Sequence, residues 1–408
     1  MAPTPLTTII VFHSYPQKPC IDGLMAAIIA TWIYQSRSSK VRLVPYSRTK
    51  KSFDRLKQTV EETDVMGDFG RQQIVYVDCT PDLEEEIEFL EKIVDKIPIT
   101  VYDHHQMRDD APVRRLNDYS NFELNFNADK CAAKMMYNLM LESGVEAKYD
   151  IENLLTVVQF SEYEGMDFTV AGKVEAEKIT NAAFKKAMNP SNEELIKDVE
   201  KIDMSLFYVL DQVLTNEKDW AFFADSSLTS DEVFNKFEIQ SKLYLERTNL
   251  ILSGRDMDVY SADKLTAYLD LMHKLPGVLA SGKVIENVKI ADKIVSVYAA
   301  NINIFHYGRS LEPMVVKELQ TRGASYAILM NDPTRNAKTG ALSYYFSLRR
   351  VDGAFSARDL AFYLLDITGS KIGGGHPWAS GVTLNKDQYQ KYLNDFLNQQ
   401  DCQIIISQ

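Results

Sequence analysis

The chain has 408 residues, and at about 150 residues per domain this length predicts two or three domains. Hydrophobic residues make up 45% of the chain and charged residues 25%, as in folded globular proteins, which argues against a disordered chain or a coiled-coil rod. The net charge of −12 disfavours a broad surface for long duplex nucleic acid, because such binding needs many Lys and Arg side chains, but it leaves a local basic pocket open.

Strand-like and helix-like segments alternate in the first part of the chain. Short runs rich in β-branched residues predict strands at Thr7–Phe12, Val41–Tyr46, Ile74–Val77 and Ile99–Asp103. Apolar residues at helical spacing predict helices at Gly23–Tyr34, Lys51–Thr63 and Glu84–Lys96. This alternation predicts βαβ units and therefore an α/β fold with a parallel sheet.

Polar side chains that can bind metals follow three of these predicted strands. His13 comes after the first strand, and Asp78 comes after the third. The fourth strand ends in Asp103, His104 and His105. Ligand sites of open parallel sheets lie beyond the carboxyl ends of the strands, so these side chains are expected to converge. An Asp next to paired imidazoles favours a metal site, because a carboxylate can fix the tautomer of a metal-binding His. Asp78 taken alone can equally be a helix cap.

The middle of the chain is predicted to be helical. Helices are expected at Asn127–Gly144 and Ile151–Tyr163, and the second leads into an acidic cluster that contains Glu164. Residues 169–283 are interpreted as a helical connector, because their motifs indicate no chemistry.

A second α/β pattern fills the last part of the chain. Strands are predicted at Ile294–Ala300, Tyr326–Met330 and Leu342–Leu348, the last followed by Arg349. The run Gly373-Gly374-Gly375-His376 can bring backbone amides and an imidazole to an anion, although glycine triplets are also common in turns. The fork of Arg349 suits two phosphate oxygens, but the residue can equally be an exposed charge at a strand end.

The cysteines and the amino-terminal residues indicate the cellular compartment in which the protein is expected. Cys20, Cys79, Cys131 and Cys402 form no CxxC pair, which favours neither a zinc ribbon nor a disulfide framework. Met1 to Thr8 lack the pattern of a targeting peptide, and no apolar run is long enough to span a membrane. We therefore expect a cytoplasmic protein with no membrane partner.

Two of these motifs together resemble a known family. Asp103-His104-His105 and Gly373-Gly374-Gly375-His376 are similar to the two signatures of the DHH phosphoesterase superfamily and its DHH-associated domain. The resemblance implies a parallel-sheet DHH domain at 1–168, the helical connector at 169–283, and a smaller α/β substrate-binding domain at 284–408, with a cleft between the two domains. It also implies a hydrolase that uses one or two manganese ions, or magnesium, zinc or iron.

The resemblance also assigns roles by position. It implies metal ligands at His13, Asp22, Asp78, His104 and Glu164, with Asp78 bridging two ions. It implies catalytic roles for Asp78, Asp103, His104 and His105. Substrate binding is expected from Arg349, Gly373, Gly374, Gly375 and His376.

Two positions depart from the pattern of the superfamily. Cys20 stands where Asp is commoner, as in a branch with Cys-x-Asp-Gly, and the later acidic position is Glu164, with Glu162 and Asp167 as rivals. A thiolate is a softer ligand that shifts metal preference toward zinc or iron. A thiolate-ligated site, a site with one metal only, and an inert buried Cys20 all remain open.

The leading functional hypothesis is a metal-dependent phosphoesterase acting on short oligonucleotides or small nucleotides. A polyphosphate or pyrophosphate hydrolase is an alternative with the same chemistry. A catalytically degenerate relative that serves as a binding or assembly subunit is the alternative from another class, and an oligomer is compatible with all three. A nucleotide-binding fold of another kind is disfavoured, because no GxGxxG or GxxxxGK[ST] loop follows Phe12.

Overall fold

The computed structural model describes residues 6–14, 19–64, 71–105, 107, 111–162, 217–225, 227–252, 277, 279–280, 282–290, 293–301, 319–320, 322–330, 333–335, 341–352, 354–375, 377 and 379–397. These residues divide into two compact units, the first with the described residues up to 252 and the second with those from 277 onward. Among the described helices, none combines the length and the apolar character that a membrane-spanning helix needs.

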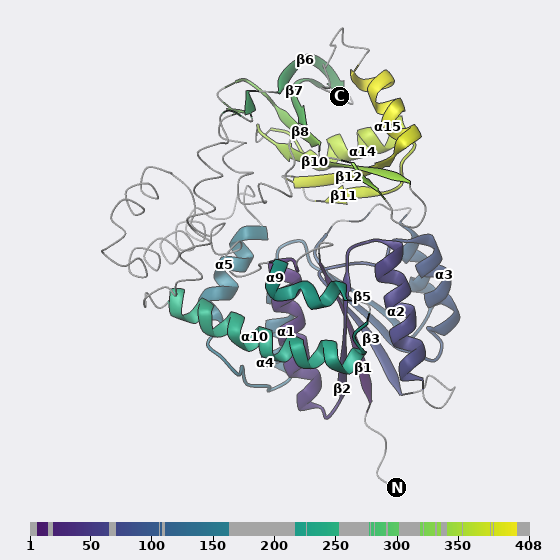
Figure 1. The fold of residues 1–408 in the computed structure, drawn as a ribbon, viewed down its shortest axis with the longest axis vertical. Coiled ribbons are helices and arrows are strands. Elements are labelled where there is room, and N and C mark those ends of the chain that lie inside the picture. Colours follow the sequence, from purple (N-terminus) through teal and green to yellow (C-terminus); the bar gives the residue numbers. More distant parts are fainter. Residues whose placement is uncertain are drawn as a thin grey trace. The chain divides into compact units, whose positions relative to one another are not determined.

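The first unit is built on a five-stranded parallel sheet (Figure 1). Its strands are β1 (Thr7–His13), β2 (Lys40–Tyr46), β3 (Gln72–Val77), β4 (Ile99–Asp103) and β5 (Phe122–Phe126), in the order β2-β1-β3-β4-β5. The predicted parallel sheet is therefore confirmed. From β1 the chain proceeds outward to β2 and then returns to β3 on the other side, so the strand order reverses between β1 and β3. In open parallel sheets this is the point where ligands bind.

Helices cover both faces of this sheet (Figure 1). They are α1 (Ile21–Ser36), α4 (Ala132–Glu142) and α5 (Glu152–Glu162) on one side, and α2 (Lys50–Thr63) and α3 (Glu84–Ile93) on the other, while the short 3-10 helix η1 (Pro112–Asp118) precedes β5. Helix α1 is buried on all sides from Ile21 to Tyr34, because it lies between the sheet and α4. A helix that is apolar all round is typical of such a central position.

Part of the predicted connector packs against the first sheet. It forms α9 (Glu217–Trp220), η3 (Ala221–Ala224) and α10 (Ser230–Leu252), and α10 lies along β2. The ring of Phe223 packs edge-on against Phe12 of β1 with 5.3 Å between centroids, and Arg42 of β2 pairs with Asp231 of α10. Covering an edge strand in this way prevents it from pairing with another chain.

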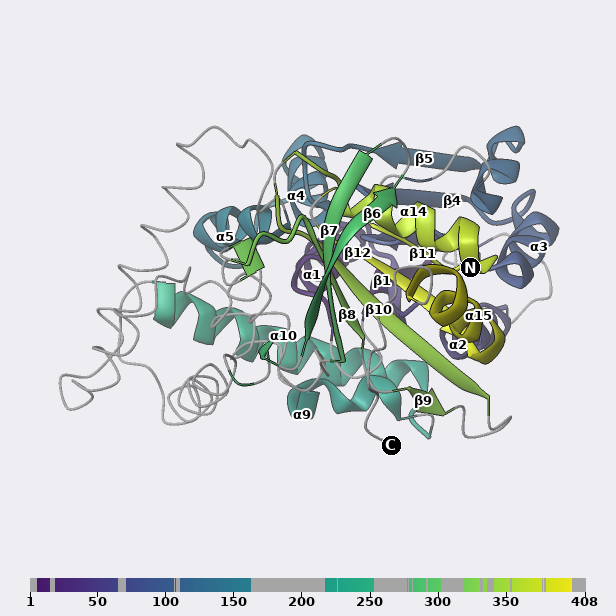
Figure 2. The same cartoon turned by 90° about the horizontal axis from the view of Figure 1, so that it is seen from above.

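The second unit contains a mixed sheet of seven strands, which fan out as the sheet twists (Figure 2). The strands are β6 (Lys283–Ile290), β7 (Lys293–Asn301), β8 (Tyr326–Met330), β9 (Thr334–Arg335), β10 (Leu342–Arg350), β11 (Gly373–Gly375) and β12 (Ala379–Asn385). Only β7 and β8 pair in parallel among the described strands of this sheet. Helices α14 (Ala357–Thr368) and α15 (Lys386–Tyr392), with the π-helical turn η5 (Leu393–Leu397), pack on the sheet through Leu360, Leu364 and Tyr392.

A buried carboxyl group lies inside the first unit between α3 and the sheet. Glu86 of α3 is fully buried and accepts hydrogen bonds from the hydroxyls of Tyr46 and Tyr76, the second at 2.9 Å. Burial raises the pKa of Glu86 to about 7, even though both tyrosine hydrogen bonds act to lower it. Near neutral pH the folded protein therefore holds a proton on Glu86 that the unfolded chain releases.

We expect Glu86→Gln to change the pH dependence of stability. The unfolded carboxyl ionises near its ordinary pKa of 4.5 and the folded one only near 7, so wild-type stability falls as pH rises through this interval. Gln carries no such charge, so the variant should gain about 2 to 3 kcal/mol on wild type between pH 5 and pH 8. Urea unfolding at the two pH values measures this difference. Glu88→Gln, on the exposed side of α3, serves as control. An equal difference at both pH values would contradict the assignment.

Candidate metal centre

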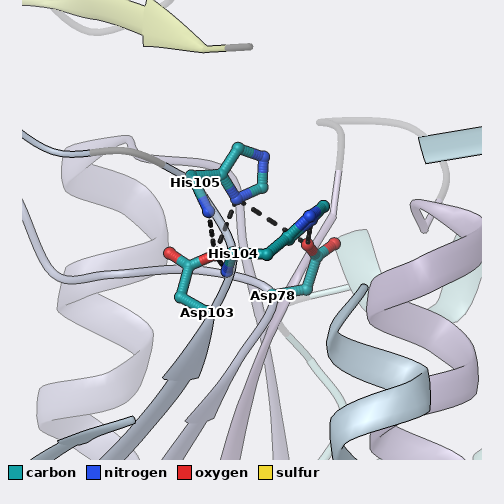
Figure 3. Close-up of side chains that lie close together, drawn as sticks. All are labelled: Asp78, Asp103, His104 and His105. Atoms are coloured by element: carbon teal, nitrogen blue, oxygen red, sulfur yellow. Dashed lines mark hydrogen bonds and ion pairs between the residues drawn. The ribbon is translucent and has the colours of Figure 1, made fainter. Parts of the chain in front are cut away.

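The carboxyl ends of three neighbouring strands bring five side chains together. His13 is the last residue of β1, Asp78 directly follows β3, and Asp103 ends β4, with His104 and His105 next along the chain. Figure 3 shows Asp78, Asp103 and the two adjacent imidazoles gathered above the strand ends. The site thus lies at the reversal of strand order, where the sheet topology places it.

Asp78 is the centre of this arrangement. Its Oδ2 lies 3.2 Å from Nδ1 of His13, and its Oδ1 lies 3.1 Å from Nε2 of His104. The two carboxylate oxygens therefore face two different imidazoles. The backbone of Asp78 has a φ of +58° and donates its N–H to the carbonyl of Tyr102. This left-handed conformation is uncommon outside glycine, and such strain is found preferentially at functional sites.

Asp103 holds the two histidines that follow it. Its Oδ1 accepts hydrogen bonds from the backbone N–H of His104 at 2.8 Å and of His105 at 3.2 Å, and it lies 2.7 Å from the ring Nδ1 of His105. Its Oδ2 accepts from the hydroxyl of Thr80 at 2.6 Å. Thr80 was not expected from the sequence, although its place just after a strand end was a usable signal. Asp103 therefore orients the two histidines that follow it.

Asp22 joins the site from α1 and also fixes another helix. Its two oxygens accept the backbone N–H groups of Ala132 and Ala133, at 2.8 and 2.7 Å, at the start of α4. A carboxylate is favourable there, because the first N–H groups of a helix lack partners within the helix. Its Oδ2 also lies 3.4 Å from Nε2 of His104, so Asp22 positions α4 and contacts the site at once.

A close backbone contact brings the start of α1 to the site. A Cβ atom added to Gly23 would lie 2.4 Å from the carbonyl oxygen of His13, so only glycine fits there. This approach places the buried Cys20, directly before α1, next to the end of β1. The sequence Cys20-Ile21-Asp22-Gly23 thus carries two polar side chains to the centre and the glycine that permits it.

The protonation states of the site favour metal binding. Burial acts to raise the pKa of Asp78, but hydrogen bonds from His104 and His13 outweigh it and lower that pKa well below its usual range. Burial likewise opposes ionisation of Asp103, but the charge and hydrogen bond of His105 lower its pKa to about 2. Burial lowers the pKa of His13. At neutral pH the carboxylates are therefore charged and His13 is neutral, as metal ligands must be.

The donor atoms fit divalent metal ions. Two sets of side chains, one of Asp78, Asp103, His104 and His105 and the other of His13, Cys20 and Asp78, place ligand atoms within 4.8 Å of one another. Atoms bound to one ion at about 2.0 to 2.3 Å can lie up to about 4.5 Å apart, so small side-chain movements suffice. Both sets contain Asp78, and Asp22 belongs to neither.

The remaining predicted site residues lie elsewhere. Glu164 and His376 fall outside the described residues. Arg349 is buried in β10 of the second unit, where its guanidinium donates to the carbonyls of Leu348 at 2.8 Å and Ser380 at 3.4 Å. Its role toward substrate stays a prediction.

The predicted glycine run has a packing role in the second unit. Gly373–Gly375 form strand β11, which pairs antiparallel with β12. An added Cβ at Gly375 would lie 2.7 Å from the carbonyl oxygen of Ala379, and Gly374 and Gly375 have φ values of +141° and +140°. Only glycine adopts this backbone readily, which explains the run without an anion. Binding of an anion by these amides stays a prediction.

Arg48 is a basic residue near the site that the sequence did not single out. It follows the end of β2 with a φ of +52°, and its Nε lies 3.6 Å from Asp82. Burial acts to lower the pKa of Arg48, but the charges of Asp82 and Asp103 outweigh it and raise that pKa. Asp78 and Asp103 were predicted because polar residues at strand ends gather at one edge of the sheet. The same reasoning was sufficient to predict Arg48.

Comparison with known proteins bears on the fold. No family model and no curated protein matches the sequence. Among solved structures, the chain is similar to the DHH domain of a protein described as a member of a family of ribosomal proteins, with 12% identity, a TM-score of 0.52, and 96% of this chain and 87% of that one covered. This likeness shows that the chain has the fold of a DHH-domain protein, which confirms the fold implied by the sequence.

Two further solved structures are more distant. A protein of uncharacterised role from Helicobacter pylori G27 has 14% identity and a TM-score of 0.31, with coverage of 97% of this chain and 99% of that one. An exopolyphosphatase-related protein from Bacteroides fragilis has 14% identity and a TM-score of 0.41, with coverage of 97% and 93%. These TM-scores are too low to show a shared fold.

Proposed function

We propose that this chain is a metal-dependent phosphoesterase that hydrolyses phosphodiester bonds of short oligonucleotides or small nucleotides. The observation that carries the proposal is Asp78, whose two oxygens face His13 on one side and His104 on the other. A carboxylate in this position is suited to bridge two ions, and manganese is the metal we propose because carboxylate oxygens suit it. Two bound ions would lower the pKa of the attacking water and neutralise the phosphate oxygens.

The protein side chains around Asp78 have separate roles in this proposal. His13, Asp22 and His104 would share the ions with Asp78. Asp103 keeps His105 in one orientation through the 2.7 Å contact to its Nδ1. Figure 3 shows the other ring nitrogen of His105 pointing away from the carboxylates, where it can contact a phosphate or donate a proton to the leaving oxygen.

The charge of the chain favours a short substrate. A net charge of −12 repels long nucleic acid, whereas one basic group can still hold a few phosphates. Arg48, which is 31% exposed, supports binding of a short substrate, because its positive charge adds to that of the ions in attracting phosphates. The buried cysteines of the first unit support a reducing compartment such as the cytoplasm.

A panel of substrates tests the proposal. Wild type is incubated with a diribonucleotide, phosphoadenosine phosphate, a cyclic dinucleotide and polyphosphate, with and without manganese. We expect manganese-dependent hydrolysis of at least one nucleotide substrate. His104→Ala should lose about 100-fold or more of that activity, because it removes a group that faces Asp78. Thermal unfolding of the variant separates loss of the site from loss of the fold.

The other outcomes of the panel are equally informative. Turnover of polyphosphate alone would replace the diesterase with a phosphoanhydride hydrolase. Equal turnover by His104→Ala would exclude this histidine from the reaction. Absence of hydrolysis with manganese, in a sample that also binds no manganese, would favour the binding or assembly role.

A further inference from the structure

We propose that Cys20 is a metal ligand that, with His13 and Asp78, forms a site selecting zinc-like ions over manganese. This inference rests on the proposed metal-dependent function and names which ion one half of the centre takes. The sulfur of Cys20, a ring nitrogen of His13 and an oxygen of Asp78 lie within 4.8 Å of one another. One nitrogen, one oxygen and one sulfur donor thus lie close together, and His13 faces the Asp78 oxygen that does not face His104.

The local backbone is built to hold the thiol in this place. Cys20 is 4% exposed and directly precedes α1, with extended backbone angles. The 2.4 Å approach that Gly23 alone permits ties this helix start to the carbonyl of His13. The start of α1, which follows Cys20, therefore lies against the end of β1. Ser, Thr, Asp or Asn are the preferred residues before a helix, and Cys20 makes no capping hydrogen bond, so capping does not account for a cysteine here.

A second thiol near the centre, that of Cys79, is bonded elsewhere. The sulfur of Cys79, the residue after Asp78, donates to the carbonyls of Val77 at 3.4 Å and Val11 at 3.6 Å. It is fully buried and belongs to neither set of ligand-type side chains. Among the described cysteines, only Cys20 belongs to a set of ligand-type side chains, so a sulfur signal from a bound metal is expected from Cys20.

The donor set determines the metal. A thiolate adds a soft donor that raises the preference for zinc or iron, whereas carboxylate oxygens without a thiolate also suit manganese or magnesium. The two sides of Asp78 differ in this respect, because the side of His104 and His105 offers only nitrogen and oxygen. Cys20 makes the centre chemically asymmetric.

Cobalt substitution of the full chain tests this inference. Metal-free protein is titrated with Co²⁺ and followed by absorption, because a bound thiolate gives a charge-transfer band in the near ultraviolet. We expect the band in wild type and its loss in Cys20→Ser. Cys131→Ser is the matched control, because Cys131 is also buried, directly precedes a helix and makes no capping hydrogen bond. The control should keep the band.

Competition between ions gives a second readout. The preference of wild type for Zn²⁺ over Mn²⁺ should fall by about tenfold or more in Cys20→Asp, which restores an oxygen donor. Cobalt binding without the band in wild type, or a band that persists in Cys20→Ser, would overturn the role of Cys20 and leave the proposed hydrolase intact. Failure of wild type to bind any divalent ion would overturn both. X-ray absorption of zinc-loaded wild type needs no variant, and absence of a sulfur neighbour would also overturn the inference.

Discussion

Replacing Asp78 by Asn is expected to abolish hydrolysis, with kcat/KM reduced about 1,000-fold or more. The amide has one oxygen in place of two and carries no charge, so it cannot present acceptors to both His13 and His104. Asn also tolerates the left-handed backbone that Asp78 adopts at φ +58°, so the fold should survive. Steady-state kinetics on the preferred substrate, with metal content measured on the same sample, tests this expectation.

A neighbouring carboxylate offers the matched control. Asp82 lies four residues after Asp78, in the segment that joins β3 to α3, and pairs with Arg48, but it belongs to neither set of ligand-type side chains. Asp82→Asn should change kcat/KM by less than about tenfold, as expected for a charge that contacts no metal. Similar losses in both variants would indicate that general charge balance, and not the bridging position, makes Asp78 important.

Gly23→Ala is expected to separate α1 from the end of β1. The added Cβ would meet the carbonyl oxygen of His13 at 2.4 Å, and a backbone atom cannot rotate away as a side chain can. Overpacking of this kind should cost about 3 kcal/mol of unfolding free energy. The helix must shift, and Cys20 and Asp22 shift with it, so metal affinity should fall together with stability. Denaturant unfolding and metal titration measure the two effects.

Gly144→Ala serves as the control for this substitution. Gly144 follows α4 with a φ of +66°, and an added Cβ there would meet nothing within 4 Å. The variant should lose about 1 to 2 kcal/mol from the left-handed backbone alone and keep its metal affinity. If Gly23→Ala bound metal as tightly as Gly144→Ala, the contact between α1 and β1 would not be what holds the centre together.

Local patterns in the sequence were sufficient to predict most strands of the first sheet. Strands β1 to β4 are short buried runs separated by helices with apolar faces, and this alternation leaves little choice but a parallel arrangement. Strand β5 was missed, although Phe122, Leu124 and Phe126 alternate with polar residues. It is a half-buried edge strand, and its pairing with β4 depends on tertiary contacts. The antiparallel pairing in the second sheet was not visible for the same reason.

The candidate site was predictable because a parallel sheet brings the residues at the carboxyl ends of its strands to one edge. Once the strands are parallel, residues just after them must share one edge, which placed His13, Asp78 and Asp103 together. The sequence did not reveal that Asp22 also binds the start of α4, since that contact joins positions 22 and 132. Anion binding by the glycine run of the second unit stays a prediction, and the structure adds a packing reason for Gly375 that spacing alone does not disclose.

The central claim is that Asp78 bridges two metal ions. Anomalous diffraction from crystals soaked with manganese, and separately with zinc, tests it most directly. The prediction is two peaks about 3.5 to 4 Å apart, one beside each carboxylate oxygen of Asp78, the first next to His13 and the second next to His104. A site without peaks, or with only a single peak, would contradict the bridging role of Asp78.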